Sequence, residues 1–106
     1  MTSRSQAAIP ADQRRTVETA LDRLIARLNM PEDRLEYAAR GAAIILSARS
    51  PGDTSAYPIA RLRYTAGTWC LDWRRATERW SELDHSTDVR TLVRLLGTDP
   101  WGTFWG

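Results

Sequence analysis

Apolar residues recur along residues 11–29 with the period of an amphipathic helix. Their spacings of three, four, seven and eight positions form one stripe on a helix of about 3.6 residues per turn. The stripe consists of Val17, Ala20, Leu21, Leu24, Ile25 and Leu28. Asp12 is a candidate cap at the start of the helix, and Pro31 ends it. We therefore predict a first helix over residues 11–29 whose apolar side covers a core.

The period then changes to the alternation that is typical of β-strands. Residues 35–40 alternate apolar and polar side chains, and residues 43–49 form a strand-like apolar run. A two-residue turn at residues 40–41 would place Tyr37 opposite Ile44. We therefore predict a hairpin with one apolar face.

A second hairpin is predicted over residues 59–75, with a tight turn at residues 66–67. Its apolar face pairs Tyr64 with Trp69, Leu62 with Leu71, and Ala60 with Trp73. Its other face pairs Arg63 with Cys70, Arg61 with Asp72, and Ile59 with Arg74. A slip by one residue would bury the arginines, so this register is favoured.

A short fifth strand over residues 79–83 leaves the position of Trp80 open. A two-residue turn at residues 77–78 places Trp80 on the aromatic face, whereas a three-residue turn places it on the arginine face. We favour the two-residue turn.

A second helix follows, with Ser86 or Thr87 as its cap and Gly97 as its end. Its apolar stripe consists of Val89, Leu92, Val93 and Leu96.

The order of elements predicts the fold class. A helix, four or five strands joined by short connections, and a second helix indicate an antiparallel sheet with both helices on one face. We predict a two-layer α+β domain over residues 11–106 that includes a C-terminal aromatic tail. Residues 1–10 are small or polar and are predicted to form a flexible N-terminal segment.

Length and composition limit the class of protein. The 106 residues suit one domain with one core. No apolar run approaches the roughly 18 residues that span a bilayer, and no secretory signal is visible. With Cys70 as the one cysteine, no intrachain disulfide can form. We expect a cytoplasmic protein without a membrane partner.

Every one of the fifteen basic residues is arginine, although the net charge is only +2. Arginine forms paired hydrogen bonds with phosphate and carboxylate, which favours a nucleic-acid or phosphate surface. Codon use in a GC-rich genome gives the same excess without any such function, and this second interpretation is favoured because the net charge is small. Arginines that cluster on one surface would support the first interpretation, and arginines that are scattered would support the second.

The C-terminal part carries a recognisable pattern of spaced tryptophans. It reads Trp69-x-Leu71-x-Trp73-x-Arg75-Ala76-x-x-x-Trp80, then a helix, then Asp99-Pro100-Trp101-Gly102-x-Phe104-Trp105-Gly106. Over about residues 60–106 this resembles small bacterial proteins grouped as domain of unknown function 3024. The resemblance implies a single domain and brings no assigned activity. Members often have Cys where this chain has Thr103, so a role of that Cys would not carry over.

Chemistry-bearing residues give little support for catalysis. Cys70 would need a base and an electropositive setting to act as a nucleophile, and His85 is far along the chain. One His and one Cys do not make a zinc site, and no nucleotide-binding glycine pattern exists. The acidic residues flank turns and the second helix start. We predict no metal, no cofactor and no catalytic residue.

The arginine face of the predicted sheet is the constellation that favours a function. Arg61, Arg63 and Arg74 project from the same side of adjacent strands, and Arg75 lies near the edge. Such a face can hold single-stranded nucleic acid, although Asp72 neutralises part of it. A hydrated face whose charges pair with one another is the favoured interpretation of these residues, and the nucleic-acid surface is the hypothesis to test.

Trp101, Phe104 and Trp105 allow two interpretations. They either fold back into the core or anchor a protein partner; we favour the core.

The sequence as a whole favours a binding or regulatory module that acts on protein or nucleic acid. A homodimeric interaction protein is the alternative, and a small enzyme is the least favoured class.

Overall fold

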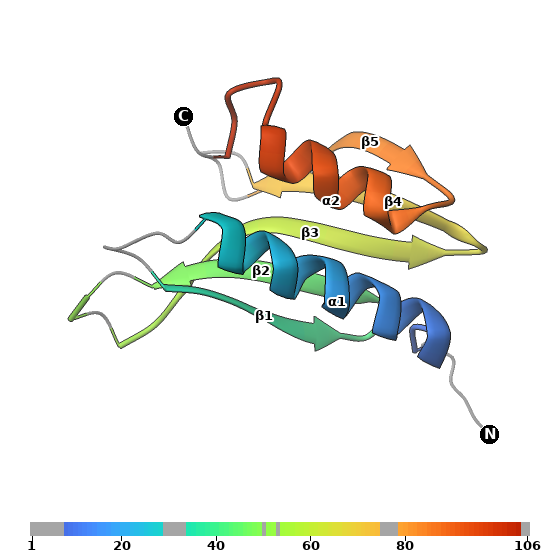
Figure 1. The fold of residues 1–106 in the computed structure, drawn as a ribbon, viewed down its shortest axis with the longest axis horizontal. Helices are drawn as coiled ribbons and strands as arrows, with labels where there is room; N and C mark the ends of the chain where they lie inside the picture. Colours follow the sequence, from blue (N-terminus) through green and yellow to red (C-terminus); the bar gives the residue numbers. More distant parts are fainter. Residues whose placement is uncertain (1–7, 29–33, 50, 53, 75–78, 105–106) are drawn as a thin grey trace.

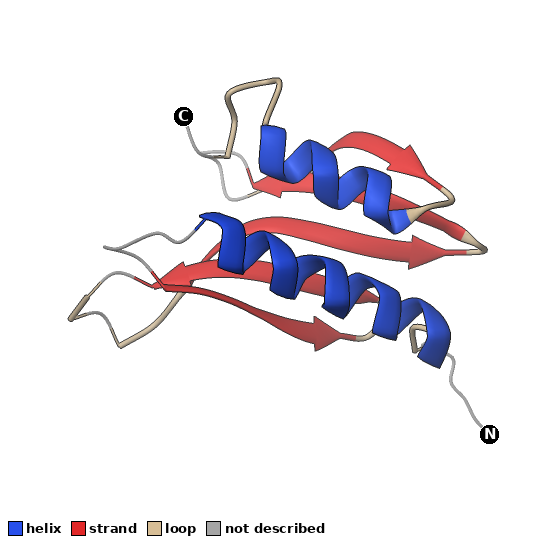
Figure 2. Cartoon of the chain, viewed as in Figure 1, coloured by secondary structure: helices blue, strands red, loops and turns tan. Residues whose placement is uncertain are grey.

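In the part of the chain that the structure describes, two helices cover one face of a five-stranded sheet. The structure is a computed structural model and describes residues 8–28, 34–49, 51–52, 54–74 and 79–104. The elements are α1 (Ala11–Leu28), β1 (Arg34–Arg40), β2 (Ala43–Arg49), β3 (Tyr57–Thr65), β4 (Thr68–Arg74), β5 (Trp80–Ser86) and α2 (Val89–Thr98). The strands are antiparallel in sequence order, and both helices lie on the same side (Figures 1 and 2). The predicted fold class is confirmed.

The apolar stripe of α1 faces the core, as predicted. Val17, Leu21 and Leu24 are buried, and the other three stripe residues pack against them. Asp12 is not the N-cap of α1 but lies in its first turn. Its negative charge there still stabilises the helix through the helix dipole. The predicted end of this helix at Asn29 and Pro31 lies outside the described residues.

Two polar contacts fasten α1 to the sheet. The fully buried Trp69 on β4 donates its Nε1–H to Gln13 Oε1 at 2.9 Å. The Tyr37 hydroxyl on β1 donates to Asp22 Oδ1 at 2.7 Å. Burial, followed by this hydrogen bond, raises the pKa of Tyr37 to about 12. The helix is therefore tied to both halves of the sheet.

The register of the β1–β2 hairpin differs from the prediction by two residues. Tyr37 lies opposite Leu46 and not opposite Ile44, because the turn consists of Gly41 and Ala42. Gly41 has a φ of 61°, and a hairpin turn with a positive φ at its first central residue favours glycine there. A shift by two residues keeps each side chain on its predicted face.

The β3–β4 hairpin has the predicted register. Tyr64 lies opposite Trp69, Leu62 opposite Leu71, and Arg61 opposite Asp72. The rings of Tyr64 and Trp69 meet edge to face at 5.1 Å between centroids. Apolar and charged side chains are separated onto opposite faces as the alternation predicted.

The predicted position of Trp80 is wrong. Trp80 lies opposite Arg74, and the guanidinium carbon of Arg61 is 4.8 Å from the centroid of its ring. It therefore shares the arginine face. The β4–β5 register shifts between Leu71 and Asp72, which changes the alternation along β5.

The ends of α2 also differ from the prediction. The N-cap is Asp88, whose Oδ1 accepts a hydrogen bond from the Arg90 amide at 3.0 Å. Gly97 does not end the helix but lies within it, and the left-handed C-cap is Asp99 with a φ of 47°. A Cβ atom on Gly97 would be 2.9 Å from Leu24 Cδ1, so this glycine allows α2 to approach α1 closely.

The C-terminal segment turns back beside the end of α2. Both oxygens of Asp99 accept backbone hydrogen bonds, from the Thr103 amide at 2.8 Å and the Phe104 amide at 2.9 Å. Phe104 packs against the core, whereas Trp101 is 40% exposed and meets the Phe104 ring edge to face. Trp105 lies outside the described residues.

Candidate functional site

The face of the sheet opposite α1 and α2, which we call the open face, has more positive than negative charge. Strand alternation and the pairing register place six arginines and three carboxylates on it, an excess of three positive charges among the described strand residues. The arginines are Arg34, Arg40, Arg49, Arg61, Arg63 and Arg74, and the carboxylates are Glu36, Asp72 and Glu82. Three of the predicted site residues thus share one surface.

Asp72 is a buried carboxylate at the centre of this face. It is 1% exposed, and Arg61 Nε and Arg63 Nε approach its Oδ2 at 2.8 and 2.6 Å. Arg63 Nη2 also donates to Oδ1 at 3.1 Å. The hydrogen bond with Asp72 raises the pKa of Arg63 above its ordinary value. A carboxylate that loses water is stable only when such partners replace it, so both arginines have a structural role.

Trp80 adds an aromatic ring to the same surface. Its ring lies under the Arg61 guanidinium at a distance suited to a cation–π contact. The open face therefore carries a ring that the sequence prediction assigned to the aromatic face.

Cys70 and His85 lie opposite one another on β4 and β5 but do not form a nucleophilic pair. Burial, followed by the charge of Glu82, raises the pKa of the Cys70 thiol. His85 Nδ1 lies 3.4 Å from Glu82 Oε2, and Arg63 Nη2 lies 3.5 Å from Glu82 Oε1. The thiol is therefore held in its protonated, weakly nucleophilic form.

The far end of the open face is held by another ion pair. Arg49 contacts both carboxylate oxygens of Glu36 at 3.2 Å and donates to the Thr54 carbonyl at 2.6 Å. The hydrogen bond from Arg49 lowers the pKa of Glu36. By contrast, Arg34 and Arg40 at the ends of β1 are exposed. The predicted site residue Arg75 lies outside the described residues.

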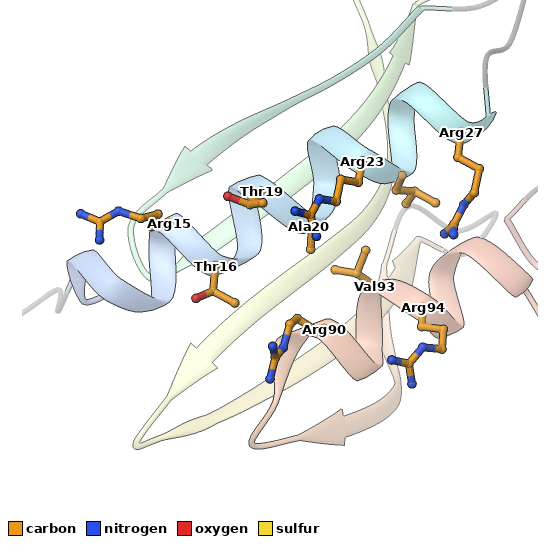
Figure 3. Close-up of a pocket in the computed structure, with 10 residues that line it drawn as sticks. Arg15, Thr16, Thr19, Ala20, Arg23, Arg27, Arg90, Val93 and Arg94 are labelled. Carbon is orange, nitrogen blue, oxygen red and sulfur yellow. The ribbon is translucent and has the colours of Figure 1, made fainter.

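A second basic surface lies on the other layer, and sequence reasoning missed it. A groove of about 500 Å³ runs between the helices, with Arg15, Thr16, Thr19, Ala20, Arg23, Leu24 and Arg27 on α1 and Arg90, Val93 and Arg94 on α2 (Figure 3). We call it the helix groove. Its signal in the sequence is arginine at four-residue spacing in both helices, at 23 and 27 and at 90 and 94.

Neither surface resembles a metal site. No group of three His, Cys, Asp or Glu side chains among the described residues is arranged to hold a metal ion. In the same part of the chain, no helix is long and apolar enough to cross a lipid bilayer.

The model of a family described as a domain of unknown function (DUF3024) matches residues 9–106. The chain belongs to the DUF3024 family. The match extends the resemblance seen at residues 60–106 to the first helix and the first hairpin. No curated protein and no solved structure matches the chain. Membership of DUF3024 gives the domain a place among known sequences without assigning it an activity.

Proposed function

We propose that this DUF3024 domain is a non-enzymatic binding module that holds single-stranded nucleic acid on the open face of its sheet. The observation that carries the proposal is an uncovered sheet face on which the Trp80 ring accompanies an excess of three positive charges. Sheets of this kind bind unpaired bases by stacking them on rings and guanidinium planes while cations contact the phosphates.

The ion pairs with Asp72 leave binding capacity on the open face. A guanidinium has five N–H donors, and Arg61 uses only its Nε–H on Asp72. The Arg61 plane above Trp80 is therefore held in place, and its outer N–H groups have no hydrogen-bond partner among the described residues that would keep them from a phosphate or a base edge. Arg34 and Arg40 extend the positive surface to the edge strand.

The chemistry of the open face favours binding over catalysis. The raised pKa of Cys70 argues against a thiolate nucleophile. His85 is mostly exposed and lies beside Glu82 on the surface. A small enzyme therefore has the weakest support.

Quenching of tryptophan fluorescence by a single-stranded oligonucleotide tests the proposal. We expect binding that weakens steeply with salt and exceeds binding to a duplex. The affinity should fall less steeply with salt in Arg34→Gln combined with Arg40→Gln. The negative slope of log binding constant against log salt concentration should become shallower by about 0.7 for each lost phosphate contact. Trp80→Leu should reduce the quenching.

The matched control is Arg23→Gln combined with Arg94→Gln, which removes the same charge from the helix layer. Its oligonucleotide affinity should match that of the unchanged protein. Equal losses in both double variants, or no quenching at micromolar oligonucleotide, would contradict the proposal. If sedimentation then shows a dimer, the homodimeric alternative is favoured.

A further inference from the structure

We infer that the helix groove is a separate binding site for a compact ligand that carries two or more linked phosphate groups. Five of its ten lining residues are arginines, and none is a carboxylate. Its volume of about 500 Å³ lies within the roughly 300–1,000 Å³ typical of small-ligand sites. Charge of one sign around a concave surface attracts and concentrates multivalent anions.

The arginines of the groove are less paired than those of the open face. Arg90 contacts Asp88 at 3.0 Å, but Arg15, Arg23, Arg27 and Arg94 form no ion pair with any described residue. The carboxylates of α1 that could have neutralised the groove have other partners. Glu18 pairs with Arg14, and Asp22 accepts from Tyr37.

This arrangement is unfavourable in the absence of an anion. Like charges four residues apart on a helix repel one another, and each helix contributes such a pair to the groove. Asp88 offsets part of the repulsion on α2 through its ion pair with Arg90. No described carboxylate forms an ion pair with Arg23 or Arg27 on α1, and the lining holds no acidic side chain. A bound polyphosphate would remove the repulsion from both helices at once.

The close approach of the helices brings their arginines to one ligand. Gly97 on α2 presents no side chain to α1, and a Cβ atom there would lie 3.4 Å from Arg27 Nη2 as well as against Leu24. Figure 3 shows Arg27 extending from α1 toward α2. Arginines four residues apart on one helix are about 6 Å apart along its axis, so two linked phosphates can contact both arginines of such a pair.

The rest of the lining indicates binding without hydrolysis. Ala20, Leu24 and Val93 supply apolar surface, and Thr19 supplies a hydroxyl donor. The Thr16 hydroxyl is already committed, since it donates to the Asp12 carbonyl at 3.0 Å. The lining contains no His, Cys, Asp or Glu that could act as a base toward water. Both inorganic polyphosphate and a nucleoside triphosphate have the required chemistry, and the apolar surface would contact the base of the latter.

Calorimetric titration of the full chain with tripolyphosphate tests this site. We expect micromolar binding, with inorganic phosphate at the same ionic strength binding far more weakly. Arg23→Gln combined with Arg94→Gln should raise the Kd on the order of tenfold. Arg34→Gln combined with Arg40→Gln is the matched control and should change the Kd less than about twofold.

Circular dichroism should show that the groove variant is folded and at least as thermally stable as the unchanged protein without ligand. Arg27→Gln alone serves as a second variant if the double variant is unstable. Equal losses in the groove and control variants, or no binding of tripolyphosphate at millimolar concentration, would overturn the inference.

Two further titrations identify the source of the phosphates. A nucleoside triphosphate that binds several-fold more tightly than tripolyphosphate indicates contact between the base and the apolar surface, whereas equal affinity indicates inorganic polyphosphate. Either result supports the site. A third result would overturn the inference. If the unchanged protein does not bind tripolyphosphate and the groove variant loses oligonucleotide binding, the groove is part of a nucleic-acid surface. The open-face proposal is tested independently by the Arg34 and Arg40 variant.

Discussion

The open face and the helix groove are both rich in arginine, yet their arginines have different surroundings. On the open face, Arg61 and Arg63 hold the buried Asp72, and Arg49 holds Glu36. In the groove, four arginines form no ion pair with any described residue. The comparison shows that the number of arginines on a surface does not by itself indicate whether that surface binds a ligand. An arginine whose charge is used within the fold stabilises the fold, whereas one without a partner is available to a ligand.

The largest expected difference between the surfaces is in stability. Arg63→Met removes two hydrogen bonds from a carboxylate that is 1% exposed, so we expect the free energy of unfolding to fall by about 2–3 kcal/mol. Arg23→Met in the groove should change it by less than about 0.5 kcal/mol. Urea unfolding followed by circular dichroism measures both. Equal effects would show that the distinction between the two surfaces is wrong.

A smaller effect is expected at the contact between the helix layer and the sheet. Tyr37→Phe removes the hydrogen bond to Asp22 and should lower stability by about 1 kcal/mol. The pKa of Tyr37 is raised from 10 to about 12 in the folded state. Folding therefore favours the neutral phenol, and this contribution is complete below pH 10 and is lost as the pH rises toward 12. Thermal melts below and above pH 10 should show a steeper alkaline loss in the unchanged protein than in Tyr37→Phe.

The smallest effect is expected at the edge of the groove. Asp88→Asn keeps a good N-cap for α2 but removes the charge that pairs with Arg90. Stability should change by less than about 0.5 kcal/mol, and tripolyphosphate should bind about threefold more tightly because Arg90 becomes available. Calorimetry measures the change in Kd. Weaker binding in this variant would indicate that Asp88 positions Arg90 for the ligand.

Much of the fold could be predicted because the relevant patterns are local. The stripe from Val17 to Leu28 specified α1, and the strict alternation through Arg61, Leu62 and Arg63 specified the face and register of β3. The turn before β2 was predicted at residues 40–41 but lies at residues 41–42. This turn needs a positive φ at its first central residue, and Gly41 supplies it.

The candidate sites were less predictable because they depend on contacts between distant segments. Arg61, Arg63 and Arg74 were placed together correctly by alternation, but the burial of Asp72 beneath two of them was not foreseen. The groove was missed because α1 and α2 come from opposite ends of the chain. Each helix alone shows only a polar side with spaced arginines.

The amino-acid sequence by itself determined the order of the elements, the apolar side of each helix and the separation of aromatic from charged residues along β3 and β4. These properties follow from side-chain periodicity within single segments. The tertiary structure decided which face holds Trp80, how fully Asp72 loses contact with water and whether the arginines of the two helices meet. A register shift changes alternation only once two strands are paired, and the electrostatic surroundings of a charge depend on neighbours that the fold brings from elsewhere.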